Sequence, residues 1–156
     1  MNSTVLAPVL PPPAAVAPSG ASPRILVVDD DADLCRLEAA ILNSAGFSVA
    51  TALNSAAAWN RLQTDDYDLL VTDYLMPGSS GLALVRQLRV AEIQVPVVMI
   101  SGTLDSLDLP KLTTDPWSRI HAFVRKPFTI QEFLSAVRSA LRLNAPTTSP
   151  RHLATA

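Results

Sequence analysis

Short apolar runs alternate with segments of helical periodicity along most of the chain. The runs are rich in Val, Ile, Leu and Phe and are too short for helices, which is typical of buried strands. They occupy residues 24–28, 47–52, 68–72, 95–100 and 120–124. Strict alternation of such strands with helices favours the α/β class, with a parallel sheet, right-handed crossovers and helices on both faces.

The helical segments carry their own start and stop signals. The first has an apolar stripe that ends before Gly46, and Asn54 is placed to cap the second. Residues 82–88 fit a third helix, and the last opens with a capping box at residues 129–132 (Thr-Ile-Gln-Glu). The stripe of the first helix consists of Leu34, Leu37, Ile41, Leu42 and Ala45.

Residues 102–119 depart from this regularity. Three leucines hint at a helix there, but Pro110 interrupts them, so the sequence predicts an irregular fourth helix, short or bent, beside a long loop. Trp117 either anchors a partner or fills the core, and the second interpretation is favoured. We interpret His121 as an ordinary strand residue rather than a phosphate donor.

The two ends differ in composition from the centre. Residues 1–23 are rich in Pro, Ala and Ser without hydrophobic periodicity, which predicts a disordered leader. Residues 144–156 are expected to form a disordered tail, which leaves residues 24–143 as one predicted domain. The single cysteine, Cys35, excludes an internal disulfide and is interpreted as a small core residue.

Composition narrows the range of partners. The hydrophobic fraction of 49% suits a sheet that is buried on both faces. The net charge is −2 and no Lys/Arg cluster is present, so direct nucleic-acid binding is not expected. No apolar run is long enough to span a bilayer, and the N-terminal stretch lacks the basic region of a signal peptide. The expected location is cytoplasmic, without membrane association.

Four predicted strands end in polar side chains. Asp29 and Asp30 follow the first run, Asp73 follows the third, Ser101 the fourth and Lys126 the fifth. Because parallel strands share one carboxyl edge, these groups are expected to converge there. Carboxylates crowded together repel one another, and Mg²⁺, which prefers oxygen ligands, relieves the repulsion. The alternative is that Asp29, Asp30 and Asp31 merely start a helix.

Asp73 is the best nucleophile candidate, since a carboxylate can attack phosphorus and form an aspartyl phosphate. The transition state spreads negative charge over the equatorial oxygens. Mg²⁺ and the Lys126 ammonium would neutralise that charge, and the Ser101 hydroxyl can donate a hydrogen bond to it. The alternatives are a simple strand-end cap for Ser101 and a solvated surface residue for Lys126.

Taken together, these motifs resemble the receiver domain of two-component response regulators. The resemblance implies a flavodoxin-like, doubly wound sheet of five parallel strands in the order 2-1-3-4-5. It also implies that Asp73 accepts phosphate from a histidine kinase or phosphotransfer protein. Asp30, Asp73 and the backbone carbonyl of Leu75 would bind Mg²⁺ directly, and Asp29 would do so through water.

The resemblance also implies a switch. Ser101 and Lys126 would bind the phosphoryl oxygens, and Phe123 falls at the switch aromatic position of the family. On phosphorylation the Ser101 hydroxyl would move toward the phosphate, and Phe123 would pack inward behind it. Ordinary core packing is the alternative interpretation for Phe123.

The sequence therefore predicts a phosphorylation-controlled switch that acts on a downstream protein target and catalyses only its own phosphotransfer and dephosphorylation. One alternative is a metal-dependent phosphohydrolase, but Leu75 stands where such an enzyme often places a second acid. Another is a receiver-like binding module that takes no phosphate, which the complete set of acids, hydroxyl and lysine disfavours.

Overall fold

The computed structural model describes residues 21–144 and contains one parallel sheet with the strand order β2-β1-β3-β4-β5. The fold class and the order predicted from the sequence are confirmed. Most of the predicted leader (1–23) and tail (144–156) lies outside the described residues. The strands are β1 (Arg24–Val28), β2 (Ser48–Ala52), β3 (Leu69–Asp73), β4 (Val97–Ser101) and β5 (Ala122–Arg125).

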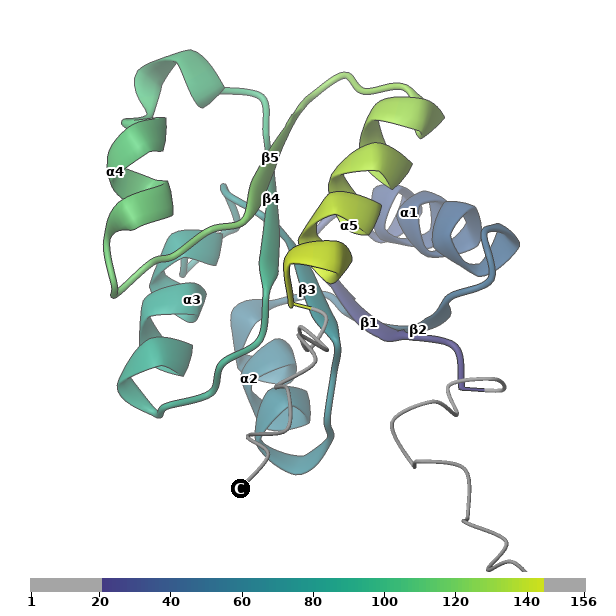
Figure 1. Cartoon of the computed structure of the whole chain (residues 1–156), viewed down its shortest axis with the longest axis horizontal. Coiled ribbons are helices and arrows are strands. Elements are labelled where there is room, and N and C mark those ends of the chain that lie inside the picture. The colour runs from purple at the N-terminus through teal and green to yellow at the C-terminus, as the bar shows by residue number, and fades with distance from the viewer. Residues whose placement is uncertain (1–20, 145–156) are drawn as a thin grey trace, which may run out of the picture.

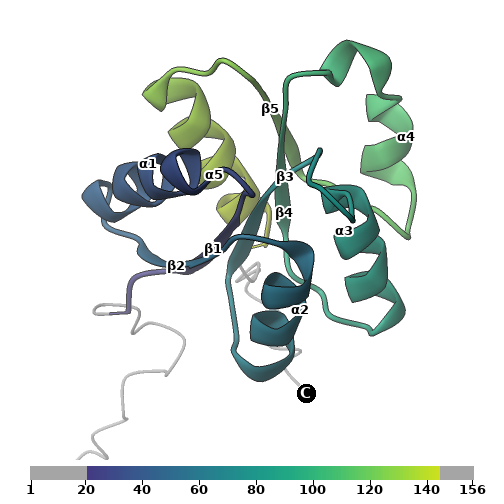
Figure 2. The same ribbon diagram turned by 180° about the vertical axis from the view of Figure 1, so that it is seen from behind.

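The helices cover both faces of the sheet (Figures 1 and 2). On one face lie α1 (Ala32–Ser44) and α5 (Ile130–Asn144), and on the other lie α2 (Ser55–Thr64), α3 (Gly81–Val90) and α4 (Leu109–Thr114). A short 3-10 helix, Leu104–Ser106, precedes α4. Within residues 21–144, no helix is long and apolar enough to cross a membrane.

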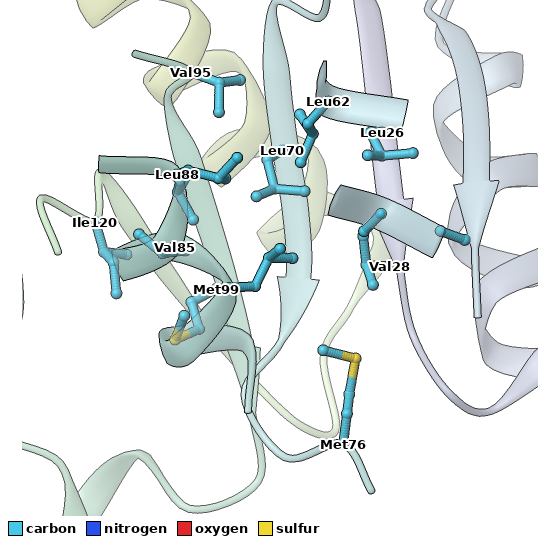
Figure 3. Packing of buried hydrophobic residues seen from close by; sticks show 14 of the residues in the cluster. Leu26, Val28, Leu62, Leu70, Met76, Val85, Leu88, Val95, Met99 and Ile120 are labelled. Carbon is cyan, nitrogen blue, oxygen red and sulfur yellow. The ribbon is translucent and has the colours of Figure 1, made fainter. Parts of the chain in front are cut away.

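Alternating strand residues build two apolar cores, one on each face of the sheet. Leu26 and Leu70 point into the core under α2 and α3 (Figure 3), whereas Ile25 and Leu69 point into the core under α1 and α5. Every residue of β3 and β4 is buried. Burying each large aliphatic side chain contributes about 1.5–3 kcal/mol to the free energy of folding. The central strands therefore hold the residues at their carboxyl ends in fixed positions.

The predicted helix caps are present. Asn54 accepts a hydrogen bond from the Ala57 N–H at 2.7 Å. In the capping box, the Glu132 N–H donates to Thr129 Oγ1 at 3.1 Å and the Thr129 N–H donates to Glu132 Oε2 at 2.8 Å. Asp31 accepts from the first turn of α1, so the helix-start interpretation of the acid run holds for this one residue.

Two expectations for the helices are wrong in part. The inner face of α1 consists of Cys35, Glu38 and Leu42, while Leu37 of the predicted stripe is 52% exposed. Pro110 does not interrupt a helix but lies in the first turn of α4, after the N-cap Asp108. Because the first helical N–H groups have no partner within the helix, proline costs little there. The fourth helix is short, as predicted.

The preference for Trp117 in the core is also wrong. Its side chain is 59% exposed in the segment between α4 and β5. Ile120 and Leu112 are the buried residues of this stretch and join the core under α3. His121 behaves as a strand-flanking residue, since its Nδ1 accepts a hydrogen bond from the Val97 N–H at 3.1 Å.

Candidate functional site

Three carboxylates meet at the carboxyl edge of the sheet. Asp29 and Asp30 follow β1, and Asp73 is the last residue of β3, the strand next to β1. One oxygen from each carboxylate lies within 4.8 Å of the other two. Asp29 and Asp73 are buried and Asp30 is exposed, so the protein encloses part of the cluster and the side at Asp30 is open to solvent.

Lys126 reaches this cluster from the far side of β4. Its Nζ lies 3.2 Å from Asp73 Oδ1 and 3.5 Å from Asp29 Oδ2. Burial lowers the pKa of Lys126, but the carboxylates of Asp73 and Asp29 outweigh burial and raise it overall. The lysine is therefore a permanent cation at the site. The structure excludes the alternative of a freely solvated surface side chain, because the Lys126 side chain is only 26% exposed.

The electrostatics favour a bound divalent cation. Burial raises the pKa of Asp73, and the charges of Asp29 and Asp30 raise it further against the opposing effect of Lys126. Among the described residues, the buried Asp29 Oδ2 accepts no hydrogen bond, and the Lys126 ammonium at 3.5 Å is its only neighbouring cation. A single ammonium thus faces three carboxylates. In phosphoryl-transfer sites, Mg²⁺ binds one or two carboxylates and keeps its other positions for water and phosphate oxygens. The three carboxylates, with one side open to solvent, fit that ion.

Ser101 is buried at the end of β4, but its hydroxyl is engaged within its own loop. Ser101 Oγ accepts from the Thr103 N–H at 3.0 Å and shares a hydrogen bond of 3.1 Å with Thr103 Oγ1. The Lys126 N–H donates to the Ser101 carbonyl at 2.9 Å, which ties the ends of β4 and β5 together. Ser101 thus lies at the carboxyl end of β4 with its hydroxyl turned toward Thr103.

The two remaining predicted residues, Phe123 and Leu75, lie outside the group of charged side chains. Phe123 is half-buried and packs against the core under α2, α3 and α4. Leu75 follows Asp73 in the turn before α3, and its side chain is 58% exposed. The role of its backbone carbonyl in binding Mg²⁺ stays a prediction.

Sequence reasoning missed Glu38, a fourth acid beside this cluster. It projects from the inner face of α1, is 1% exposed, and its Oε1 has no partner among residues 21–144. Burial, followed by the charge of Asp29, raises the pKa of Glu38 to about 8, while Lys126 acts in the opposite direction. The available signal was its spacing from Cys35 and Leu42, which places all three on one side of a helix.

Gly81 allows the first turn of α3 to pack closely against Asp73, the phosphoacceptor candidate. A Cβ atom at Gly81 would lie 2.1 Å from the Asp73 carbonyl oxygen and 2.9 Å from Thr72 Oγ1. The Gly81 N–H donates to the Tyr74 carbonyl at 2.9 Å, so the helix start cannot retreat without losing this bond. Glycine is therefore the residue that lets α3 approach the end of β3.

Gly81→Ala is expected to lower the free energy of unfolding by about 3 kcal/mol, because the added methyl group meets rigid backbone. Denaturant unfolding followed by circular dichroism measures this loss. Gly102→Ala is the matched control, since a Cβ atom there meets nothing within 4 Å and the change should cost less than about 1 kcal/mol. Equal stability of the two variants would contradict the close approach of α3.

Comparisons with known proteins agree with this geometry. The family model of the response regulator receiver domain matches residues 25–138. The chain is similar to the uncharacterized transcriptional regulatory protein YkoG of Bacillus subtilis, with 33% identity over 80% of this chain and 54% of that protein. It is 34% identical to the DNA-binding response regulator MtrA of Mycobacterium tuberculosis, over 78% of this chain and 51% of MtrA. The chain thus spans about half the length of these curated relatives.

Solved structures show the same likeness. The receiver domain of the Francisella response regulator 1452 matches with a TM-score of 0.67 and 25% identity, over 78% of this chain and 99% of that one. The response regulator TrrA of Thermotoga maritima, solved in complex with Mg²⁺-BeF, matches with a TM-score of 0.65 and 25% identity, over 76% of this chain and 98% of that one.

Proposed function

The chain belongs to the response regulator receiver family, and we propose that Asp73 is its phosphoacceptor, supplied by a histidine kinase or phosphotransfer protein in a Mg²⁺-dependent reaction. The observation that carries this assignment is the Lys126 ammonium at 3.2 Å from Asp73, beside two further carboxylates. Receiver domains are phosphoacceptors of two-component systems and bind Mg²⁺ at an acidic pocket. In this chain, residues 24–143 would form that unit.

The residues around Asp73 suit an in-line transfer. An Asp73 oxygen forms a bond to phosphorus while the phosphorus–nitrogen bond of the phosphohistidine breaks, and the imidazole nitrogen keeps the bonding electrons. Lys126 neutralises charge that develops on the phosphoryl oxygens, and Ser101 donates a hydrogen bond to them once it leaves Thr103. Asp30, Asp73 and the Leu75 carbonyl would hold Mg²⁺ directly and Asp29 would do so through water, and the ion would supply further neutralisation of phosphoryl charge when bound.

Phosphorylation would act as a switch because it adds roughly −1.5 to −2 charges to a site that is already acidic. Ser101 and Phe123 are the elements that would respond, by turning toward the phosphate and packing inward respectively. The readout would be altered binding to a downstream protein in the cytoplasm. Receiver domains generally do not act as enzymes on other substrates, and the apolar side chain of Leu75 provides no acid for a hydrolase.

Acetyl phosphate with Mg²⁺ tests this proposal directly. Intact mass spectrometry is expected to show the addition of a single phosphate, and peptide mapping should place it on Asp73. Removal of Mg²⁺ with EDTA should abolish the mass shift, because the phosphoryl charge is then left uncompensated among carboxylates. Phosphate on another residue, or undiminished labelling in EDTA, would contradict the assignment.

A further inference from the structure

An ion pair between Asp105 and Arg125 joins the segment after Ser101 to β5. Arg125 Nη1 donates to Asp105 Oδ2 at 2.9 Å, and Arg125 Nη2 donates to Asp105 Oδ1 at 2.6 Å. This geometry is the parallel two-bond arrangement that makes arginine–carboxylate pairs specific in direction. Asp105 lies in the 3-10 helix after the loop, so the pair joins the loop to the sheet.

The ion pair connects two elements of the proposed switch. Arg125 is the sheet partner of Ser101 in the β4–β5 register and immediately precedes Lys126. Phe123 lies two residues earlier on β5, and it lines a surface cavity together with Arg125 and Leu104. The phosphate-binding hydroxyl, the switch aromatic and the ion pair therefore meet at one corner of the molecule.

The resting orientation of Ser101 opposes the proposed reaction. Ser101 Oγ accepts from the Thr103 N–H and shares a hydrogen bond with Thr103 Oγ1, and it would lose both bonds on turning toward a phosphoryl group on Asp73. Loss of these bonds would release Thr103 and free the chain from Gly102 onward to shift. Asp105 lies only three residues beyond Gly102, so such a shift would pull its carboxylate away from the Arg125 guanidinium.

We propose that Asp105 and Arg125 are positioning residues that hold the loop after Ser101 in its resting place, so that phosphoryl binding at Asp73 must break their ion pair. This inference depends on the proposed function of Asp73. Both side chains are accessible, with 84% exposure for Asp105 and 51% for Arg125. We call the ion pair between Asp105 and Arg125 the latch. Because both side chains are exposed, the latch is weak enough to open and its strength depends on salt.

The test is the affinity for beryllofluoride in the presence of Mg²⁺, measured by calorimetry on the full chain. Arg125→Gln and Asp105→Asn are each expected to tighten binding about threefold to fivefold, the range open to an exposed ion pair. The two substitutions change the net charge in opposite directions. An effect of the same sign in both therefore reports the pair itself, because a pure charge effect of Arg125→Gln would weaken the binding of an anion.

Three controls sharpen the test. The exchanged pair Asp105→Arg/Arg125→Asp should return the affinity toward that of the wild type. Arg36→Gln removes another exposed ion pair, to Asp33 on α1, and should leave the affinity unchanged. At high salt the difference between the wild type and Asp105→Asn should shrink toward zero.

The outcomes separate the two proposals. Wild-type binding with unchanged or weakened affinity in Arg125→Gln would overturn the latch and leave the assignment of Asp73 intact. Absence of wild-type binding would overturn the Asp73 assignment, and the latch with it. Tighter binding in both single variants, with recovery in the exchanged pair, would support the latch.

Discussion

Asp73→Asn is expected to abolish phosphate incorporation from acetyl phosphate. The amide is neutral and a poor nucleophile, so no acyl phosphate forms, and the ion pair to Lys126 at 3.2 Å is lost as well. Asp29 does not replace it, because its side chain is 1% exposed and already accepts a hydrogen bond from the Asp31 N–H. Intact mass spectrometry should show full labelling of the wild type and none of the variant.

The same substitution should leave the fold intact. Burial raises the pKa of Asp73, which means that its charged form is a cost to the metal-free protein at neutral pH. Replacing that charge with an amide removes the cost, so we expect thermal stability in EDTA at least equal to that of the wild type. Lys126 keeps the carboxylate of Asp29 as a partner.

Asp66→Asn provides the matched control. Asp66 is an exposed acid shortly before β3, at the opposite end of the strand from Asp73. The substitution is chemically identical, and labelling should remain at the wild-type level. Labelling that survives in Asp73→Asn, or disappears in Asp66→Asn, would show that the phosphoacceptor lies elsewhere.

The convergence of the site could be predicted because it depends on topology alone. Once the chain is assigned to a parallel sheet, residues that end neighbouring strands must share an edge, whatever their exact rotamers. Asp29, Asp73 and Lys126 needed no further information. The spacing of the apolar runs was therefore sufficient to predict that these three side chains lie at one edge of the sheet.

Two of the missed features depend on tertiary contacts, and a third had a local signal in the sequence. The burial of Glu38 contradicts its polarity, so a hydrophobic stripe drawn from the leucines placed Leu37 inward instead. The ion pair between Asp105 and Arg125 joins residues 20 positions apart through a loop whose path has no periodicity. The start of α4 at Leu109 had a local signal, because Asp108 before it is a good N-cap, but Pro110 was interpreted as a break.

Glu38→Leu is expected to stabilise the metal-free protein by several kcal/mol at pH 8. The folded state holds the Glu38 proton up to about pH 8, whereas the unfolded chain releases it near the ordinary value of 4.5. Folding between these pH values therefore takes up a proton, and stability falls as the pH rises through this window. At about 1.4 kcal/mol for each pH unit, the loss amounts to roughly 5 kcal/mol by pH 8.

Several charged groups influence the pKa of Glu38. Asp29, Asp73 and Asp31 disfavour ionisation of Glu38, and Lys126 favours it. All of them remain in the variant, as does His121, whose pKa burial lowers. The difference between the wild type and Glu38→Leu at each pH therefore isolates the contribution of Glu38. Denaturant unfolding in EDTA at pH 5, 6, 7 and 8 measures this difference.

Glu38→Gln separates charge from polarity. Glutamine cannot titrate, so its stability relative to Glu38→Leu should be constant with pH. Its buried amide would still lack hydrogen-bond partners, which costs about 1–3 kcal/mol compared with leucine. If the wild type and Glu38→Leu instead ran parallel from pH 5 to pH 8, Glu38 would be ionised in both states over this range and its pKa would not be raised by folding. The carboxyl group would then have to be solvated, which is incompatible with its burial beneath α1.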